Sequence, residues 1–141
     1  MLLLLAVLAL PGCSRQVSLR LEDHADSFTV ILKNDSSQPI DVVGDTKLGV
    51  PPSLASVQWE VSSNGRTLTP CALVDNGLRS VRVEPGTFHK METKKALIEQ
   101  VFCVPAGQYE VSASYVHSNV SIQSNKLRAT AKPRAVRPPR L

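Results

Sequence analysis

Short segments in which apolar and polar residues alternate run through most of this chain and constrain its fold more than any other feature. In the segment with the most regular alternation, 108–116, the apolar side chains are those of Tyr109, Val111, Ala113 and Tyr115. A period of two places every second side chain on one face of a β-strand, so segments of this kind are typical of half-buried strands.

Turn-forming residues separate these segments and set their number. Alternation or short β-branched runs predict further strands over 16–22, 26–33, 40–43, 57–61, 67–69, 71–74, 78–84 and 125–131. The pair Asn64-Gly65 favours a tight hairpin. The stretch 91–104 fits either a helical face or a strand, and we expect a strand. About seven short strands with turn signals roughly 8 to 12 residues apart predict an all-β chain folded as a single antiparallel β-sandwich.

The first ten residues form an unbroken apolar run, which ends at Pro11, Gly12 and Cys13 before the sequence turns polar. A run of about ten suits the core of an export signal and is shorter than the roughly 20 residues needed to cross a bilayer. We therefore expect residues 1–12 to be a signal peptide, the alternative being a buried N-terminal strand or helix. No Lys or Arg precedes the run, and one hypothesis is that translation starts further upstream.

Leu10, Gly12 and Cys13 have the spacing of a known processing motif: Leu at minus three, a small residue at minus one, and cysteine at the junction. The motif resembles the lipobox of bacterial lipoproteins, in which the cysteine sulfur receives a diacylglyceryl group before cleavage. The resemblance implies lipid attachment at Cys13, a short linker over 13–16, and a membrane-anchored protein of the bacterial cell envelope. Ser14 after the cysteine resembles the pattern that directs such proteins to the outer membrane, facing the periplasm.

A single Trp59 in an early-middle strand, the sequence 105–111 around Tyr109, and the closing sequence 124–127 carry a second resemblance. They are similar to the core tryptophan, the tyrosine corner and the start of the last strand in immunoglobulin-like and fibronectin-like domains. This resemblance implies an immunoglobulin-like β-sandwich of about seven strands over 17–131. It also implies that Trp59 and Tyr109 are buried in the core.

The chain has three cysteines. If Cys13 carries the lipid, Cys71 and Cys103 remain, and an exported protein experiences an oxidising compartment in which paired thiols are the rule. We therefore expect a disulfide between Cys71 and Cys103, the alternative being two separate buried thiols. The pairing departs from the immunoglobulin pattern, because Cys103 precedes Tyr109.

The net charge of +4 is concentrated near the C-terminus, since six of the sixteen Lys and Arg residues lie at or beyond Lys126. Upstream, ten Lys and Arg face twelve Asp and Glu, so the predicted domain is slightly acidic. Nucleic-acid binding by the domain is disfavoured, because it requires a basic surface. Residues 132–141 are basic and rich in proline, and we expect a disordered tail.

No cluster of residues indicates catalysis. His24 lies among Glu22, Asp23 and Asp26 without a recognisable ligand spacing, and a solvated turn is the better interpretation. His89 and His117 are isolated in the sequence. There is no G-x-S-x-G or phosphate-binding loop motif. We expect no metal, no cofactor and no enzymatic activity.

Together these patterns predict a non-catalytic, membrane-anchored module that binds a protein or polymer of the bacterial envelope or serves a structural role there. One alternative is a proteinase inhibitor or an envelope assembly factor, with the irregular loop 44–53 as the reactive element. A second alternative, from a different class, is a small envelope enzyme. The sequence leaves the oligomeric state open.

Overall fold

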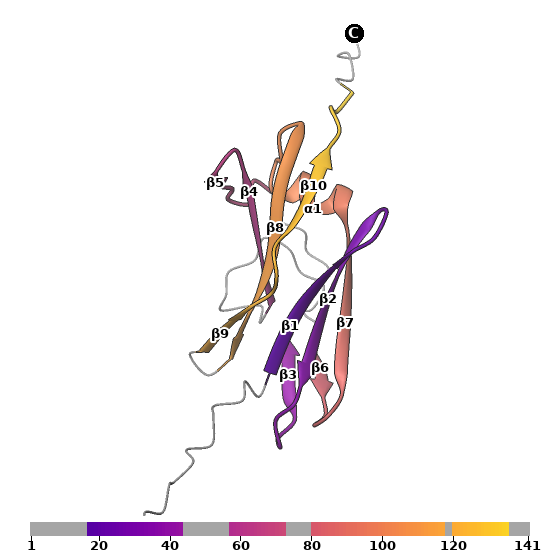
Figure 1. Cartoon of the computed structure of the whole chain (residues 1–141), viewed down its shortest axis with the longest axis vertical. Coiled ribbons are helices and arrows are strands. Elements are labelled where there is room, and N and C mark those ends of the chain that lie inside the picture. The colour runs from indigo at the N-terminus through magenta and orange to yellow at the C-terminus, as the bar shows by residue number, and fades with distance from the viewer. Residues whose placement is uncertain (1–16, 44–56, 73–79, 118–119, 136–141) are drawn as a thin grey trace, which may run out of the picture.

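The computed structural model describes residues 17–43, 57–72, 80–117 and 120–135. Within these residues the chain forms ten strands and one short helix (Figure 1). All strand pairings are antiparallel. The prediction of a mostly β chain is confirmed, although the strands are distributed over three sheets.

The first sheet contains strands β1 (Val17–Asp23), β2 (Ser27–Asn34) and β7 (Phe88–Lys94), in the order β1-β2-β7. In β1 the predicted alternation is observed, since Leu19 and Leu21 are buried while the residues between them face outward. Strand β2 is buried along most of its length, because it is the central strand.

The second sheet contains β4 (Val57–Ser63), β5 (Arg66–Thr67), β8 (Gly107–His117) and β10 (Leu127–Ala131), in the order β10-β8-β4-β5. A further strand, β9 (Val120–Gln123), pairs with the end of β8. The hairpin between β4 and β5 turns at Asn64 and Gly65, which both have positive φ values, 51° and 73°. The Asn-Gly prediction is therefore confirmed, since this turn requires left-handed backbone at both positions.

Strands β3 (Ile40–Val43) and β6 (Ser80–Val83) form a two-stranded sheet that follows on from the β2–β7 pair. The interruption between the two ladders lies at Asn34, whose backbone N–H donates to the Thr87 carbonyl at 2.9 Å. The Asn34 side chain is fully buried, and its Nδ2 donates to the carbonyl oxygens of Gln38 and Val83 at 2.8 and 3.0 Å. One amide group thus holds β3 and β6 in place beyond the end of the longer ladder.

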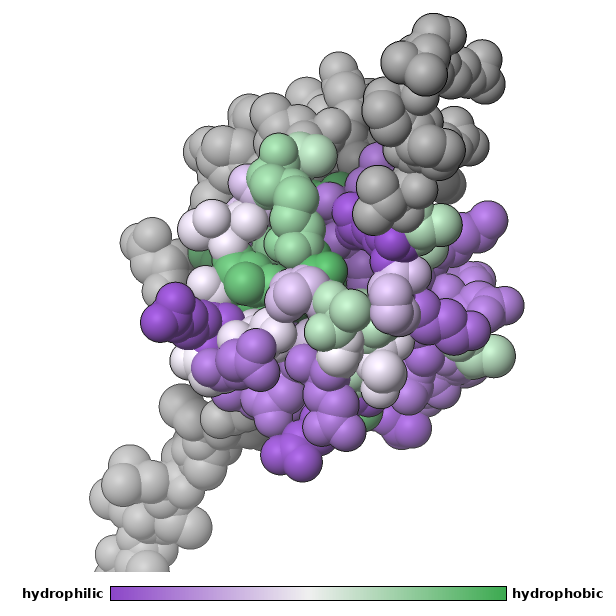
Figure 2. All heavy atoms as spheres, turned by 90° about the horizontal axis from the view of Figure 1, so that it is seen from above, coloured by the Kyte–Doolittle hydropathy of each residue, from purple (hydrophilic) through white to green (hydrophobic). Residues whose placement is uncertain are grey.

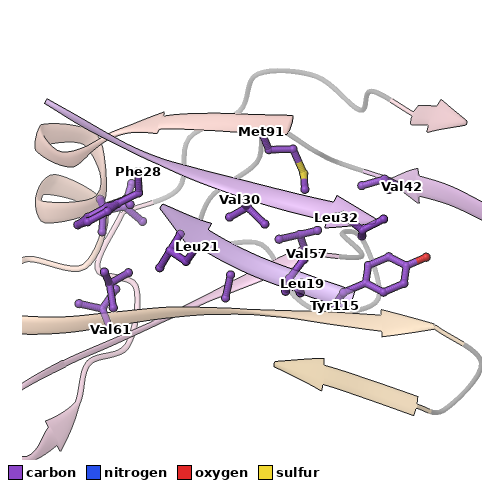
Figure 3. Close-up of a cluster of buried hydrophobic side chains, with 14 of the residues drawn as sticks. Leu19, Leu21, Phe28, Val30, Leu32, Val42, Val57, Val61, Met91 and Tyr115 are labelled. Atoms are coloured by element: carbon purple, nitrogen blue, oxygen red, sulfur yellow. The ribbon is translucent and has the colours of Figure 1, made fainter. Parts of the chain in front are cut away.

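The hydrophobic core lies between the first and second sheets. Figure 3 shows side chains of β1 and β2 pointing toward those of β4 and β8. Phe28 of the first sheet and Trp59 of the second are 6.4 Å apart between ring centroids. The largest side chains that are almost completely buried are Tyr109, Tyr115, Phe28, Leu21, Leu32 and Ile98.

The two aromatic residues expected in the core differ in their burial. Tyr109 is 1% exposed, which confirms the prediction for that residue. Trp59 is only partly buried, so the expectation of a fully buried tryptophan is wrong. It lies on the core-facing side of β4, between the buried Val57 and Val61, but its large ring extends beyond what the neighbouring side chains cover.

The expectation of a strand over 91–104 is wrong for its second half. Strand β7 ends at Lys94, and a helix, α1 (Lys95–Val101), follows directly. Ile98 and Val101 are fully buried and lie three residues apart, the spacing that places two side chains on one helical face. Ala96, Leu97 and the Glu-Gln pair after Ile98 also have high helix propensity.

The described part of the chain contains no helix that is long and apolar enough to cross a membrane. The first strand begins at Val17 and the last ends at Ala131. The predicted signal peptide, 1–12, and the linker, 13–16, lie outside the described residues.

Candidate functional site

The structure describes only part of the residues to which the sequence assigns a role. Cys13 and the loop 44–53 lie outside the described residues. Of the predicted tail, residues 132–135 are described, and they are exposed and have no regular secondary structure. Arg134 nevertheless contacts the domain, because its guanidinium donates a hydrogen bond to the backbone oxygen of Glu99 at 2.6 Å.

The predicted disulfide is present, with the Cα atoms of Cys71 and Cys103 6.0 Å apart. It links the end of α1 to the segment that follows the β4–β5 hairpin. The bond spans 32 residues of sequence, and closing such a loop stabilises a folded chain by roughly 3 to 4 kcal/mol in the chain-entropy description. A structural disulfide indicates an oxidising, extracytoplasmic location.

The backbone around this disulfide ends the helix α1, and a cysteine occupies the left-handed position at which glycine is usual. The N–H of Cys103 donates to the Gln100 carbonyl and that of Val104 donates to the Glu99 carbonyl, at 3.3 and 2.9 Å. This is the Schellman arrangement, in which glycine is preferred at the left-handed position. Cys103 occupies that position with φ 48°, so its side chain leaves the helix end toward Cys71.

The segment that carries Cys71 is also held by the backbone of α1. The N–H groups of Cys71 and Ala72 both donate to the carbonyl of Val101, at 2.8 and 3.3 Å. The disulfide therefore reinforces an existing contact. It joins this segment to the residue that follows the C-cap of α1.

Tyr109 does not make the hydrogen bond expected of a tyrosine corner, which would join the hydroxyl to upstream backbone. Its hydroxyl donates instead to the Glu99 carboxylate at 3.1 Å. Burial of the phenol, and then the negative charge of Glu99, raise the pKa of Tyr109 well above its ordinary value. The pair joins β8 to α1 and keeps the tyrosine neutral.

The acidic residues around His24 do not converge on a common point. Glu22 forms an ion pair with Arg20 at 2.9 Å, and Asp23 forms one with Lys95 at 2.6 Å. Among the residues that the structure describes, no three His, Cys, Asp or Glu side chains are arranged to hold a metal ion. Glu22 also lies 3.8 Å from the Nε2 of His24, so Glu22 and Asp23 belong to separate groups of charges.

A surface lined by polar side chains lies on the outer side of the second sheet. We call it the polar face and define it by the residues Glu60, Ser62, Glu110, Ser112, Lys126 and Arg128. These residues line shallow depressions in which the small side chains of Ser62 and Ser112 form the floor. Longer charged side chains border them, and Arg128 pairs with Glu110 at 3.1 Å.

Both signs of charge are present on the polar face, and Glu60 and Glu110 lie directly across the β4–β8 pair from Ser112 and Ser62, respectively. Ser112 is 5% exposed, and no hydrogen bond joins it to a histidine or carboxylate in the described structure. Across the sheet, Gln123 donates from its Nε2 to Glu60 at 3.5 Å. The arrangement can donate and accept hydrogen bonds along the outer side of the second sheet.

The end of the molecule that carries α1 offers a different surface. Figure 2 looks onto this end and shows a narrow apolar strip bordered by hydrophilic residues. The disulfide and the Arg134 contact both involve the helix that lies at this end.

Comparisons with known proteins add little to this picture. No family model matches the chain, and no curated protein is similar to it. Among solved structures, beta-glucosidase 3B from Thermotoga neapolitana in complex with α-D-glucose matches 82% of this chain with a TM-score of 0.38 and 16% sequence identity. The match covers 16% of the length of that enzyme. A likeness at this level carries no argument about function.

Proposed function

We propose that this protein is an exported, lipid-anchored and non-catalytic module of the bacterial cell envelope, which binds a protein or polymer partner through the polar face. In this proposal the chain is anchored through Cys13, and its domain is an immunoglobulin-like β-sandwich. The partner is polar, because the polar face offers hydroxyl, carboxylate and cationic groups and no large aromatic side chain.

The pairing of the strands supports the immunoglobulin-like arrangement. In that fold, strands A, B and E share one sheet and strands G, F and C share the other. The orders β1-β2-β7 and β10-β8-β4 correspond to these two groups when the strands are taken in chain order. The helix α1 between β7 and β8 and the small β3–β6 sheet are additions to the pattern.

The observation that carries the binding proposal is the composition of the polar face. Ser112 and Ser62 lie opposite Glu60 and Glu110 in the strand register, and no hydrogen bond in the described structure joins either serine to a carboxylate. Catalysis of acyl transfer would need such a pair within hydrogen-bond distance. Recognition of an extended polar ligand needs only the groups that are present.

The test is affinity capture from solubilised envelope with the tagged full chain. Glu110→Lys and Glu60→Lys each reverse a charge on the polar face. Glu84→Lys makes the same change at an exposed residue that follows β6 and is not part of the polar face. We expect the unmodified chain and Glu84→Lys to retain the same partner, and both polar-face variants to lose it. Equal capture by all four proteins, or turnover of a substrate, would contradict the proposal.

A further inference from the structure

The outer edge of strand β7 has backbone groups available for a further strand. The hydrogen bonds from Asn34 to Thr87 and from Lys95 to Asp26 mark the two ends of the β2–β7 ladder. In an antiparallel pair, alternate residues bond to the neighbouring strand, so the odd-numbered residues from 87 to 95 face β2. The N–H and C=O groups of Phe88, Lys90 and Glu92 and the N–H of Lys94 therefore point toward the other edge, whereas the carbonyl of Lys94, the N-cap of α1, accepts the first hydrogen bond of the helix.

This edge is open in the part of the chain that the structure describes. Strand β7 is the last strand of its sheet, and none of the described strands pairs with its outer side. The side chains of Phe88, Lys90, Glu92 and Lys94 are all exposed. An unpaired edge of seven residues is a template for another strand unless it is blocked.

The four exposed side chains lie on one face of β7, opposite the buried Met91. Their order along the strand is aromatic, positive, negative, positive. Phe88 is 59% exposed, the largest exposed fraction among the large hydrophobic residues of the described structure. The Nζ of Lys90 lies 5.6 Å from the centre of its ring.

We propose that β7 pairs with β7 of a second copy of this chain, antiparallel and around a twofold axis at Met91. In this register Lys90 of each copy lies directly opposite Glu92 of the other, and Phe88 lies opposite Lys94. Each Lys90–Glu92 pair exchanges two main-chain hydrogen bonds, and the N–H of Lys94 donates to the carbonyl of Phe88 in the other copy. The two three-stranded sheets then form one continuous sheet.

The charge pattern selects this register and this partner. An axis at Lys90 would place the two Lys90 side chains against each other. An axis at Glu92 would oppose Glu92 to Glu92 and Lys90 to Lys94. Like charges directly across a strand pair destabilise it, and opposite charges stabilise it. The axis at Met91 pairs all seven residues of β7 and opposes Lys90 to Glu92 twice, whereas an axis at His89 or Thr93 would pair only three residues of each β7. This self-complementarity favours a second copy over an unrelated extended peptide.

Sedimentation velocity of the full chain in density-matched detergent tests the proposal. We expect a dimer at micromolar concentration for the unmodified protein. Lys90→Glu or Glu92→Lys turns both ion pairs of the dimer into repulsions and should raise the dimer dissociation constant on the order of tenfold or more. The double variant Lys90→Glu/Glu92→Lys restores opposite charges in the same register and should regain dimerisation.

Arg20→Glu is the matched control, because it reverses an exposed charge on β1, the other outer strand of the same sheet. It should leave the dimer unchanged. Urea unfolding of each variant separates loss of pairing from loss of folding. A protein that remains monomeric, dimers that are unaffected by both single changes, or a double variant that fails to recover while folded would each overturn the proposal. Capture of a foreign extended peptide by a monomer would do the same.

Discussion

Tyr109 and Tyr115 are the two tyrosines of the chain, and both are nearly inaccessible to water. Burial raises the pKa of each, with further contributions from the charge of Glu99 at Tyr109 and of Asp41 at Tyr115. An absorbance titration at 295 nm should therefore place the midpoint of ionisation of each tyrosine above the ordinary phenol pKa of about 10. A midpoint at or below that pH for either residue in the folded protein would contradict the burial.

The same shift predicts how stability depends on pH. Below about pH 10 both tyrosines are protonated in the folded and unfolded states alike. Above it, the unfolded chain loses protons that the folded chain still holds, so the free energy of unfolding falls as pH rises toward the folded-state pKa values. Urea unfolding at pH 9 and above measures this decline, and Tyr109→Phe should reduce its slope.

Cys103 adopts a left-handed backbone that disfavours any residue with a Cβ. The disulfide holds Cys103 in this conformation, so the conformational strain lowers the measured stability only when the bond is removed. In a Cys71→Ser background, Cys103→Gly should be about 1 kcal/mol more stable than Cys103→Ala, because glycine adopts this conformation without strain. Urea unfolding of the two double variants measures the difference, and a more stable alanine variant would contradict the backbone geometry.

At the scale of the elements, Asn34 joins two ladders that would otherwise be separate. Its Nδ2 binds the carbonyls of Gln38 and Val83, and its Oδ1 accepts from the N–H and hydroxyl of Ser36. Asn34→Ala leaves two carbonyl groups without this donor and should destabilise the domain by about 2 to 3 kcal/mol. Chemical unfolding checks this value.

Ser36→Ala is the milder comparison for Asn34, since it removes the partly buried hydroxyl that donates to Asn34 Oδ1 but leaves both bonds of Nδ2, and should cost less than about 1 kcal/mol. Equal stability of Asn34→Ala and the unmodified protein would contradict the role of Asn34 as a junction.

Strands with strict alternation could be predicted from the sequence because their period is local. Strand β3, Ile40–Val43, has the predicted bounds, and β8 covers all of the predicted 108–116. The helix α1 was missed because Ile98 and Val101 fit a helical face while Phe102 and its neighbours also suit a strand, and the stretch is too short to decide between them. Strand β9 was missed because residues 119–121 are typical of a turn, and only pairing with β8 makes a strand of Val120–Gln123.

At the scale of the molecule, Asn125 links the two larger sheets. Its Oδ1 accepts from the N–H of Leu21 at 2.8 Å, and its Nδ2 donates to the carbonyl of the same residue at 3.0 Å. The side chain thus occupies the place of a neighbouring strand at the edge of β1. Asn125→Ala should destabilise the domain by about 1 to 2 kcal/mol in urea unfolding.

The neighbouring Lys126→Ala is the control for Asn125, because Lys126 is exposed and makes no contact with β1 in the described structure. Asn125→Asp keeps an acceptor for the Leu21 N–H but loses the donor, and should be no better than alanine. A stable Asn125→Asp variant would show that the amide does not bridge the sheets.

The candidate site could be predicted only in part. The Cys71–Cys103 bond followed from a count of cysteines, once Cys13 was assigned to the lipid. The polar face could not be predicted, because Glu60, Ser112 and Lys126 come from separate parts of the sequence and meet only through the pairing of β4, β8 and β10. Alternation shows which side chains face outward but not which strands are neighbours.

The central claim is that the protein is exported, anchored through Cys13 and closed by one disulfide. Intact-mass measurement of the protein extracted from the envelope and alkylated without reductant tests this claim most directly. We predict a chain that begins at Cys13, carries a diacylglyceryl group and gains no alkyl group. A chain that retains residues 1–12, or one that gains two alkyl groups, would contradict the account.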